Sequence, residues 1–241
     1  MTMPALDESR SRSMLSCWRR EAKRQVPSPM NDLSTLPVQE FLARVAGRTP
    51  TPGGGSVTGL AGALGCALAS MVAAYSLRRD TDPESRATIE KAGAQLRHCE
   101  QILRALITQD AVAYDKMNAA AKARRESSGN PAVEGTYERA VFEASAVPME
   151  MAAVASNVLS VIDGCKHVAS RFLLSDLGIA AALANVTARA ARFTLQANVR
   201  EIGDESQRES LLSDIDRILL HCASRHASIE AFIDRHLQET D

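Results

Sequence analysis

Apolar residues recur at helical spacing along most of the chain. The longest pattern runs from Ala87 to about Arg125, where apolar positions fall three or four residues apart. No segment shows the strict alternation that is typical of a half-buried strand. We therefore predict an all-α fold, a single domain built as a bundle of long helices. The other predicted helices cover Leu36–Ala46, Val57 to about Arg79, about Thr136–Ile162, the stretch from Ser175 through Ala180 to about Val199, and a last helix after Asp204.

The segment Val57–Leu77 holds 21 residues without a charge, which is long enough to cross a bilayer. It consists mostly of Ala, Gly and Ser, and it lacks an interfacial Trp belt. We predict a buried helix at the centre of the bundle rather than a membrane span. Small residues recur along one stripe of this helix, so a neighbouring helix can approach closely. The stripe comprises Gly55, Gly59, Gly62, Ala69 and Ala73.

Several helix ends are marked by capping residues. Asp82 followed by Pro83 predicts a helix start, and Asp204 followed by Gln207 resembles a capping pair. Ser175 is expected to cap the helix that runs on through Ala180. Pro148 falls inside a predicted helix, where it removes one backbone hydrogen bond.

Composition narrows the functional classes. The chain has 28 basic and 29 acidic residues, a net charge of −1, so no global field favours nucleic acid. Five scattered cysteines without a C-x-x-C motif argue against a disulfide framework and for the cytoplasm. Residues 1–32 are predicted to be a disordered N-terminal extension, and residues 33–241 the helical domain.

The loop that precedes the apolar helix is the most specific local feature. Its residues Pro52, Gly53, Gly54, Gly55 and Ser56 lead directly into the helix. A glycine-rich loop at a helix N-terminus offers free backbone N–H groups, which suit a carboxylate or phosphate. A tight turn that packs closely on another helix explains the same glycines equally well.

Polar residues inside apolar stretches are the other candidates. Asp110 and Tyr114 stand one turn apart on one helix face. A partly buried Asp110 would have a raised pKa and could act as an acid or base, whereas an exposed aspartate is the plainer interpretation. Ser175 and Asp176 lie in an otherwise uncharged stretch, where they either begin a helix or serve a site. The last pair, Thr194 and Asn198, can supply hydrogen bonds or simply end a helix.

Metal binding has little support in the sequence. Cys222 and His226 stand four residues apart, but two ligands do not make a metal site. There is also no Gly-x-Ser-x-Gly elbow of a serine hydrolase. We predict no metal and no cofactor.

Several blocks of sequence together resemble the cyclodeaminase/cyclohydrolase family. The first is Thr49-Pro-Thr-Pro-Gly-Gly-Gly-Ser56, which is followed by the small-residue run Leu60–Val72. Shorter matches are Asp110-Ala-Val-Ala-Tyr114, Val147-Pro148, Ser175-Asp176, and Asn198 with Asp204. The resemblance covers about residues 33–237 and implies a helical bundle that forms homodimers.

The resemblance implies a folate one-carbon enzyme. The expected reaction is hydrolysis of 5,10-methenyltetrahydrofolate to 10-formyltetrahydrofolate, and the absence of a formiminotransferase segment favours it over cyclodeamination of formiminotetrahydrofolate. Asp110 and Asp176 are the expected catalytic carboxylates. The substrate-binding candidates are Pro52, Gly53, Gly54, Gly55, Ser56, Tyr114, Ser175, Thr194 and Asn198.

Three short segments differ from the family pattern and keep a second interpretation open. Ala169-Ser170 replace Gly-Asn, Thr194 replaces the first Asn of Asn-Val-x-x-Asn, and Ala123-Arg124-Arg125 replace Leu-Pro-Lys. A non-catalytic ligand-binding homologue that kept the fold would explain these changes. The expected partners are a small folate substrate and a second copy of the chain, without nucleic acid or membrane.

Overall fold

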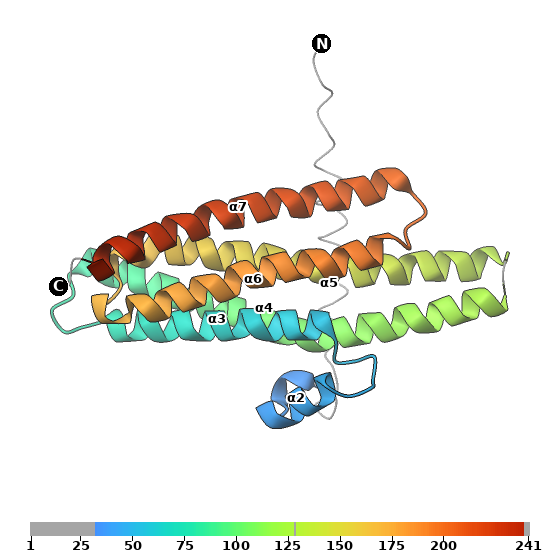
Figure 1. Ribbon diagram of the computed structural model, residues 1–241, viewed down its shortest axis with the longest axis horizontal. Helices are drawn as coiled ribbons and strands as arrows, with labels where there is room; N and C mark the ends of the chain where they lie inside the picture. The colour runs from blue at the N-terminus through green and yellow to red at the C-terminus, as the bar shows by residue number, and fades with distance from the viewer. Residues whose placement is uncertain (1–31, 128, 239–241) are drawn as a thin grey trace, which may run out of the picture. The chain divides into compact units, whose positions relative to one another are not determined.

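Long helices run back and forth along one axis in the computed structural model, which describes residues 32–127 and 129–238 (Figure 1). No strand occurs in these residues, so the predicted all-α fold is confirmed. The predicted extension, residues 1–32, lies outside the described residues except for Asp32. Residues Leu33–Asp241 form one unit. The helices are α2 (Val38–Val45), α3 (Gly54–Ser76), α4 (Pro83–Glu126), α5 (Pro131–Cys165), α6 (Leu174–Val199) and α7 (Glu205–Gln238), with 3-10 turns η2 (Leu33–Thr35), η3 (Lys166–Val168) and η4 (Arg171–Leu173).

The helices α3, α4, α5 and α6 pack in a ring, and α7 covers α5 and α6. Glycines of α3 set the closest approaches. A Cβ at Gly59 would lie 3.0 Å from Cγ1 of Ile107, and one at Gly62 would lie 2.9 Å from Cδ1 of Leu103 and 3.0 Å from Cγ2 of Thr187. The predicted small-residue stripe therefore faces α4 and α6 of the same chain.

Side chains cap three of the long helices. Oδ1 of Asp82 accepts hydrogen bonds from two backbone N–H groups of α4, and Oδ1 of Asp204 accepts one from Gln207 (3.2 Å), as predicted. Asn130 caps α5 through the N–H of Ala132, which begins that helix five residues before the expected start. The prediction that Ser175 caps α6 is wrong, because η4 leads directly into α6 at Leu174 and leaves Ser175 inside the first turn.

A side chain of α6 supplies the hydrogen bond that Pro148 removes from α5. Proline has no N–H, so the carbonyl of Ala144, four residues earlier, lacks its helical donor. Nδ2 of Asn198 donates to that carbonyl at 2.8 Å. Ala144 is 5% exposed, so no other donor is readily available to it. The contact ties the end of α6 to the middle of α5.

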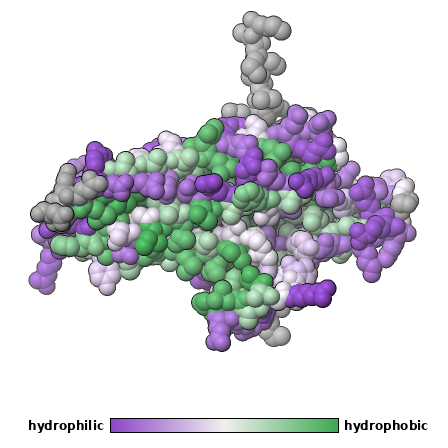
Figure 2. Space-filling model, in the orientation of Figure 1, coloured by the Kyte–Doolittle hydropathy of each residue, from purple (hydrophilic) through white to green (hydrophobic). Residues whose placement is uncertain are grey.

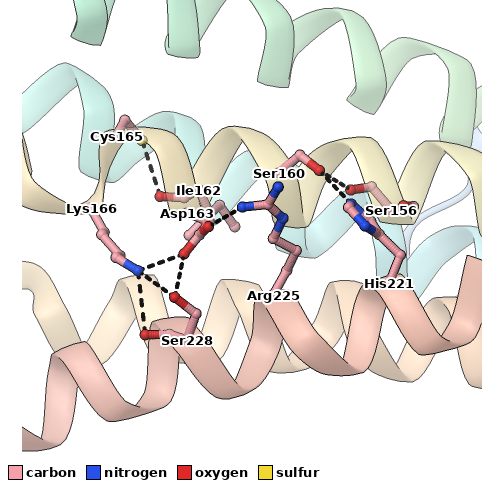
Figure 3. A network of polar contacts seen from close by, with 9 residues as sticks. All are labelled: Ser156, Ser160, Ile162, Asp163, Cys165, Lys166, His221, Arg225 and Ser228. Atoms are coloured by element: carbon pink, nitrogen blue, oxygen red, sulfur yellow. Dashed lines mark hydrogen bonds and ion pairs between the residues drawn. The ribbon is translucent and has the colours of Figure 1, made fainter.

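A polar cluster fastens α7 to the end of α5 (Figure 3). Asp163 is the centre of this cluster: its carboxylate accepts hydrogen bonds from Lys166 (2.5 Å), Arg225 (2.6 Å) and Ser228 (2.9 Å). Burial raises the pKa of Asp163, but these hydrogen bonds outweigh it and hold the pKa at about 2. Every charged group in the cluster has a partner, so we interpret it as a structural clamp.

Three helical segments are long and apolar enough, by length and composition alone, to cross a membrane. Within the bundle, 72% of the apolar window of Pro131–Val168 is buried, against 50% for Gly54–Ser76 and 39% for Arg171–Val199. Of these three segments, the two that contain α3 and α6 therefore leave more of their apolar windows uncovered than the one that contains α5.

The contact between α5 and α6 predicts a specific thermodynamic coupling. Asn198→Ala should lower the unfolding free energy by about 1–3 kcal/mol, because it leaves the buried carbonyl of Ala144 without a hydrogen-bond donor. The same change should cost much less in a Pro148→Ala background, where residue 148 regains its N–H. Urea unfolding of the four variants measures the coupling. Asn157→Ala, on the same helix α5, is the control, and its cost should not depend on residue 148. Equal costs of Asn198→Ala in both backgrounds would contradict this interpretation.

The clamp predicts an acid-dependent term in stability. Because the pKa of Asp163 is lowered on folding, its contribution is full above the unfolded pKa, near 4, and is lost as the pH falls through about 2. Linkage puts this contribution at about 2 kcal/mol. The difference in unfolding free energy between wild type and Asp163→Asn should therefore shrink from pH 5 to pH 2.5. Asp216→Asn, which removes a more exposed partner of Arg192, should show no such trend.

Candidate active site

The carboxylate of Asp110, on α4, lies against the N-terminus of α3. Ser56 Oγ donates to the carbonyl of Ile107 at 2.9 Å and to Oδ2 of Asp110 at 3.1 Å. Gly55 leaves the space for this approach, since a Cβ there would lie 1.9 Å from Oδ1 of Asp110. The glycine-rich loop and Asp110, 54 residues apart from Ser56 in sequence, therefore form one site.

Burial controls the charge of Asp110. It raises the pKa of this carboxyl above its usual value, and hydrogen bonds from Ser56 offset only part of the rise. The N-terminal end of a helix also favours the ionised form. A carboxyl under such opposed influences can take up a proton and release it again, which is the property that an acid or base catalyst needs.

The loop residues differ in their access to a ligand. Pro52, which follows a cis peptide bond, is buried together with Gly55 and Ser56. Gly53 is half-buried at the N-cap of α3, and Gly54 is exposed. We expected the backbone N–H groups here to hold an anionic part of a ligand. The nearest carboxylate is instead the chain's own Asp110, so a ligand anion needs a cation elsewhere.

The structure places the remaining candidates at different distances from Asp110. Tyr114 follows on the same face of α4 and is 37% exposed. Thr194 and Asn198 are half-buried on the last turns of α6, at the end of the bundle where α3 begins. Asn198 uses one N–H of its amide on Ala144, so the second N–H and the carbonyl oxygen remain for a ligand.

Ser175 and Asp176 lie at the opposite end of α3. Ser76, the last residue of α3, accepts a hydrogen bond at Oγ from the N–H of Ser170, just before α6. Because α3 has 23 residues, its two ends are about 33 Å apart. Within one chain the two predicted carboxylates, Asp110 and Asp176, therefore do not share a site.

A cleft that the sequence did not predict lies farther along α4. It encloses about 540 Å³ between the end of α4, the start of α5 and Glu201, and it lies on the helix face that carries Tyr114. Arg124 and Arg125 line it, and both were noted in the sequence only as a departure from a motif. The helical spacing of Asp110, Tyr114, Ala121 and Arg125 puts these residues on one face, and this pattern could have indicated the cleft from the sequence.

Among the described residues, no group of three or more His, Cys, Asp or Glu side chains could hold a metal ion. Cys222 is fully buried, and Nδ1 of His226 lies 3.1 Å from Glu230 instead of pairing with the thiol.

Relatives of the chain are named as cyclohydrolases and cyclodeaminases. The chain is 24% identical over 193 residues to methenyltetrahydrofolate cyclohydrolase of Methylorubrum extorquens, and the match covers 80% of this chain and 93% of that protein. It is 25% identical over 202 residues to formimidoyltransferase-cyclodeaminase of Mus musculus, covering 83% of this chain and 37% of the mouse protein. The chain thus spans little more than a third of the mouse relative.

A solved structure shares the fold. The formiminotetrahydrofolate cyclodeaminase of Thermotoga maritima aligns with a TM-score of 0.77 and 24% identity, over 85% of this chain and 99% of that one. The sequence model of the formiminotransferase-cyclodeaminase family matches residues 37–217. Since this match covers well over half of the sequence and includes Asp110 and the glycine-rich loop, the chain belongs to the formiminotransferase-cyclodeaminase family.

Proposed function

We propose that the chain is a folate one-carbon enzyme that hydrolyses 5,10-methenyltetrahydrofolate to 10-formyltetrahydrofolate, with Asp110 as its acid–base group. The half-buried carboxyl of Asp110 on α4, which lies against the start of α3, is the observation that carries the proposal. The M. extorquens relative, matched over 93% of its length, is named for this reaction. We propose the cytoplasm as its location, which the four free cysteines of the described residues support.

The reaction begins at the cationic carbon between N5 and N10 of the substrate. Asp110, as carboxylate, accepts a proton from a water molecule whose oxygen bonds to that carbon. The resulting tetrahedral adduct is neutral at the former cationic centre. Asp110 then returns the proton to N5 as the C–N5 bond breaks, and the hydroxyl of the adduct releases its remaining proton to solvent as it becomes the carbonyl, which leaves the formyl group on N10. The steps are proton transfers and require no metal.

Cyclodeamination of formiminotetrahydrofolate is the second candidate, and the mouse and T. maritima relatives are named for it. In that reaction N10 adds to the formimino carbon and ammonia leaves. The same carboxyl can protonate the leaving nitrogen. Release of ammonium from formiminotetrahydrofolate distinguishes the second reaction from the first.

We propose further that the chain is a homodimer joined through α3 and α6. Large apolar side chains repeat on the outer face of both helices, and Figure 2 shows hydrophobic residues gathered there. They are at least 40% exposed, which a stable aqueous surface rarely sustains over so long a stripe. The residues are Val57, Leu64 and Tyr75 on α3 and Ile179, Val186 and Phe193 on α6.

This face also adjoins both predicted carboxylates. Val57 is two residues from Gly55, and Ile179 is one turn from Asp176. Asp176 can therefore act together with Asp110 only across a boundary between two copies. We therefore propose Asp176 as a site residue of the homodimer only.

The proposed role of Asp110 predicts a large and specific loss of activity. Asp110→Asn should lower kcat/KM for methenyltetrahydrofolate by about 10²–10⁴-fold, because the amide keeps the shape but cannot carry the proton. The loss of substrate absorbance above the spontaneous rate measures it. Asp115→Asn, an exposed neighbour on α4, is the control and should retain activity.

Full turnover by Asp110→Asn would contradict the assignment. A wild-type protein that is inactive on both folates would overturn the proposed reactions and favour the ligand-binding homologue.

The proposed interface predicts the mass of the protein in solution. Light scattering at micromolar concentration should give twice the chain mass, and Val186→Asp with Phe193→Asp should reduce it to the monomer. Leu220→Asp, equally exposed on α7, should leave the dimer intact. A monomeric wild type, or a monomer that sediments with neutral lipid vesicles, would overturn the proposal.

A further inference from the structure

The 540 Å³ cleft lies on the same face of α4 as Asp110 of the candidate active site, farther toward the C-terminal end of that helix. Positions 110, 114, 117, 121 and 125 of α4 follow at intervals of three or four residues and share that face. At 1.5 Å per residue, Met117 lies about 10 Å and Arg125 about 22 Å from Asp110 along the helix axis. An elongated ligand can therefore reach the cleft with one end while the other end lies at Asp110.

Two contacts orient the guanidinium of Arg124. Its Nε lies 2.8 Å from Oε2 of Glu134, and its Cζ lies 4.6 Å from the centre of the Tyr137 ring. Tyr137 is 4% exposed and donates its hydroxyl to Glu201 at 2.5 Å. Burial first, and then Glu201, raise the pKa of this phenol, which keeps it a donor. The guanidinium is thus oriented before any ligand binds, and its terminal N–H groups remain available.

Arg125 is the second guanidinium of the cleft. Of the two acidic residues there, Glu134 pairs with Arg124, and Glu201 accepts the hydroxyl of Tyr137 and keeps its charge. Arg125 lines the cleft and has no ion pair within the described part of the chain. Two adjacent guanidinium groups at the mouth of an open cleft suit carboxylates, which they can bind through paired N–H donors.

We propose that this cleft binds the carboxylates of the glutamate tail of a folate, with Arg125 and the pre-oriented Arg124 as the binding cations. The inference rests on the proposed function for the identity of the ligand. The aromatic arm of the folate would lie along Tyr114 and Met117, which stand between Asp110 and Arg125 on the same face of α4. The N-terminus of α3 cannot serve as the tail site, because Asp110 already faces it.

The test compares substrates with and without the tail. Arg125→Gln should raise KM for 5,10-methenyltetrahydrofolate about tenfold and leave kcat within twofold, because the lost contact is far from the reacting carbon. KM for 5,10-methenyltetrahydropteroate, which lacks glutamate, should not change. Arg125→Lys should fall between the two, since it keeps the charge but loses the paired donors. Lys122→Gln removes a charge one turn away, outside the cleft, and should match wild type.

A binding measurement separates this inference from the proposed reaction. Calorimetric titration with p-aminobenzoylglutamate needs no turnover, and Arg125→Gln should weaken it about tenfold while Lys122→Gln does not. If the wild type is inactive but shows this pattern, the reaction is wrong and the tail site stands. If Arg125→Gln and Lys122→Gln behave alike in both experiments, or if the wild type does not bind the probe, the tail site is refuted.

Discussion

Asp110 can approach the N-terminus of α3 only because residue 55 has no side chain. A Cβ there would lie 1.9 Å from the carboxylate oxygen, so any other residue would displace the Asp110 carboxyl from this position. Gly59 and Gly62 allow the same helix to pack closely against α4 and α6. Close helix packing and the candidate active site are thus one constraint, since the glycines that join the helices also place the carboxyl.

Polar groups in the bundle sit where helical hydrogen bonding is interrupted. The hydroxyl and backbone N–H of Ser56 at the start of α3 face Asp110, and the carbonyl that Pro148 leaves without a helical donor accepts from Asn198. Satisfying a buried backbone group requires a side chain from another helix. Two blocks that are separate in the sequence, Val147-Pro148 and Asn198, therefore act as one contact. This explains Asn198 without assigning it to a ligand.

The ends of the bundle carry different chemistry. The clamp of Asp163, Lys166 and Arg225 closes one end, with each charge paired. Toward the other end lie Asp110, the open cleft and Arg125, whose charge is not paired within the described residues. Paired charges contribute stability, whereas an unpaired guanidinium beside a cleft is available to a ligand. This contrast is the physical basis for placing function at the α3 N-terminal end.

The sequence by itself determined the helices, because the apolar period, Asp82, Asp204 and the glycine-rich loop act over a few residues. It also identified Asp110 and its family motif. Only the tertiary structure decided what these residues contact: Ser175 does not cap α6, Asp176 lies about 33 Å away at the far end of α3, and Arg124 meets Tyr137. Periodicity assigns a residue to a face of its own helix. Which other helix covers that face depends on packing between segments tens of residues apart, and no local pattern encodes it.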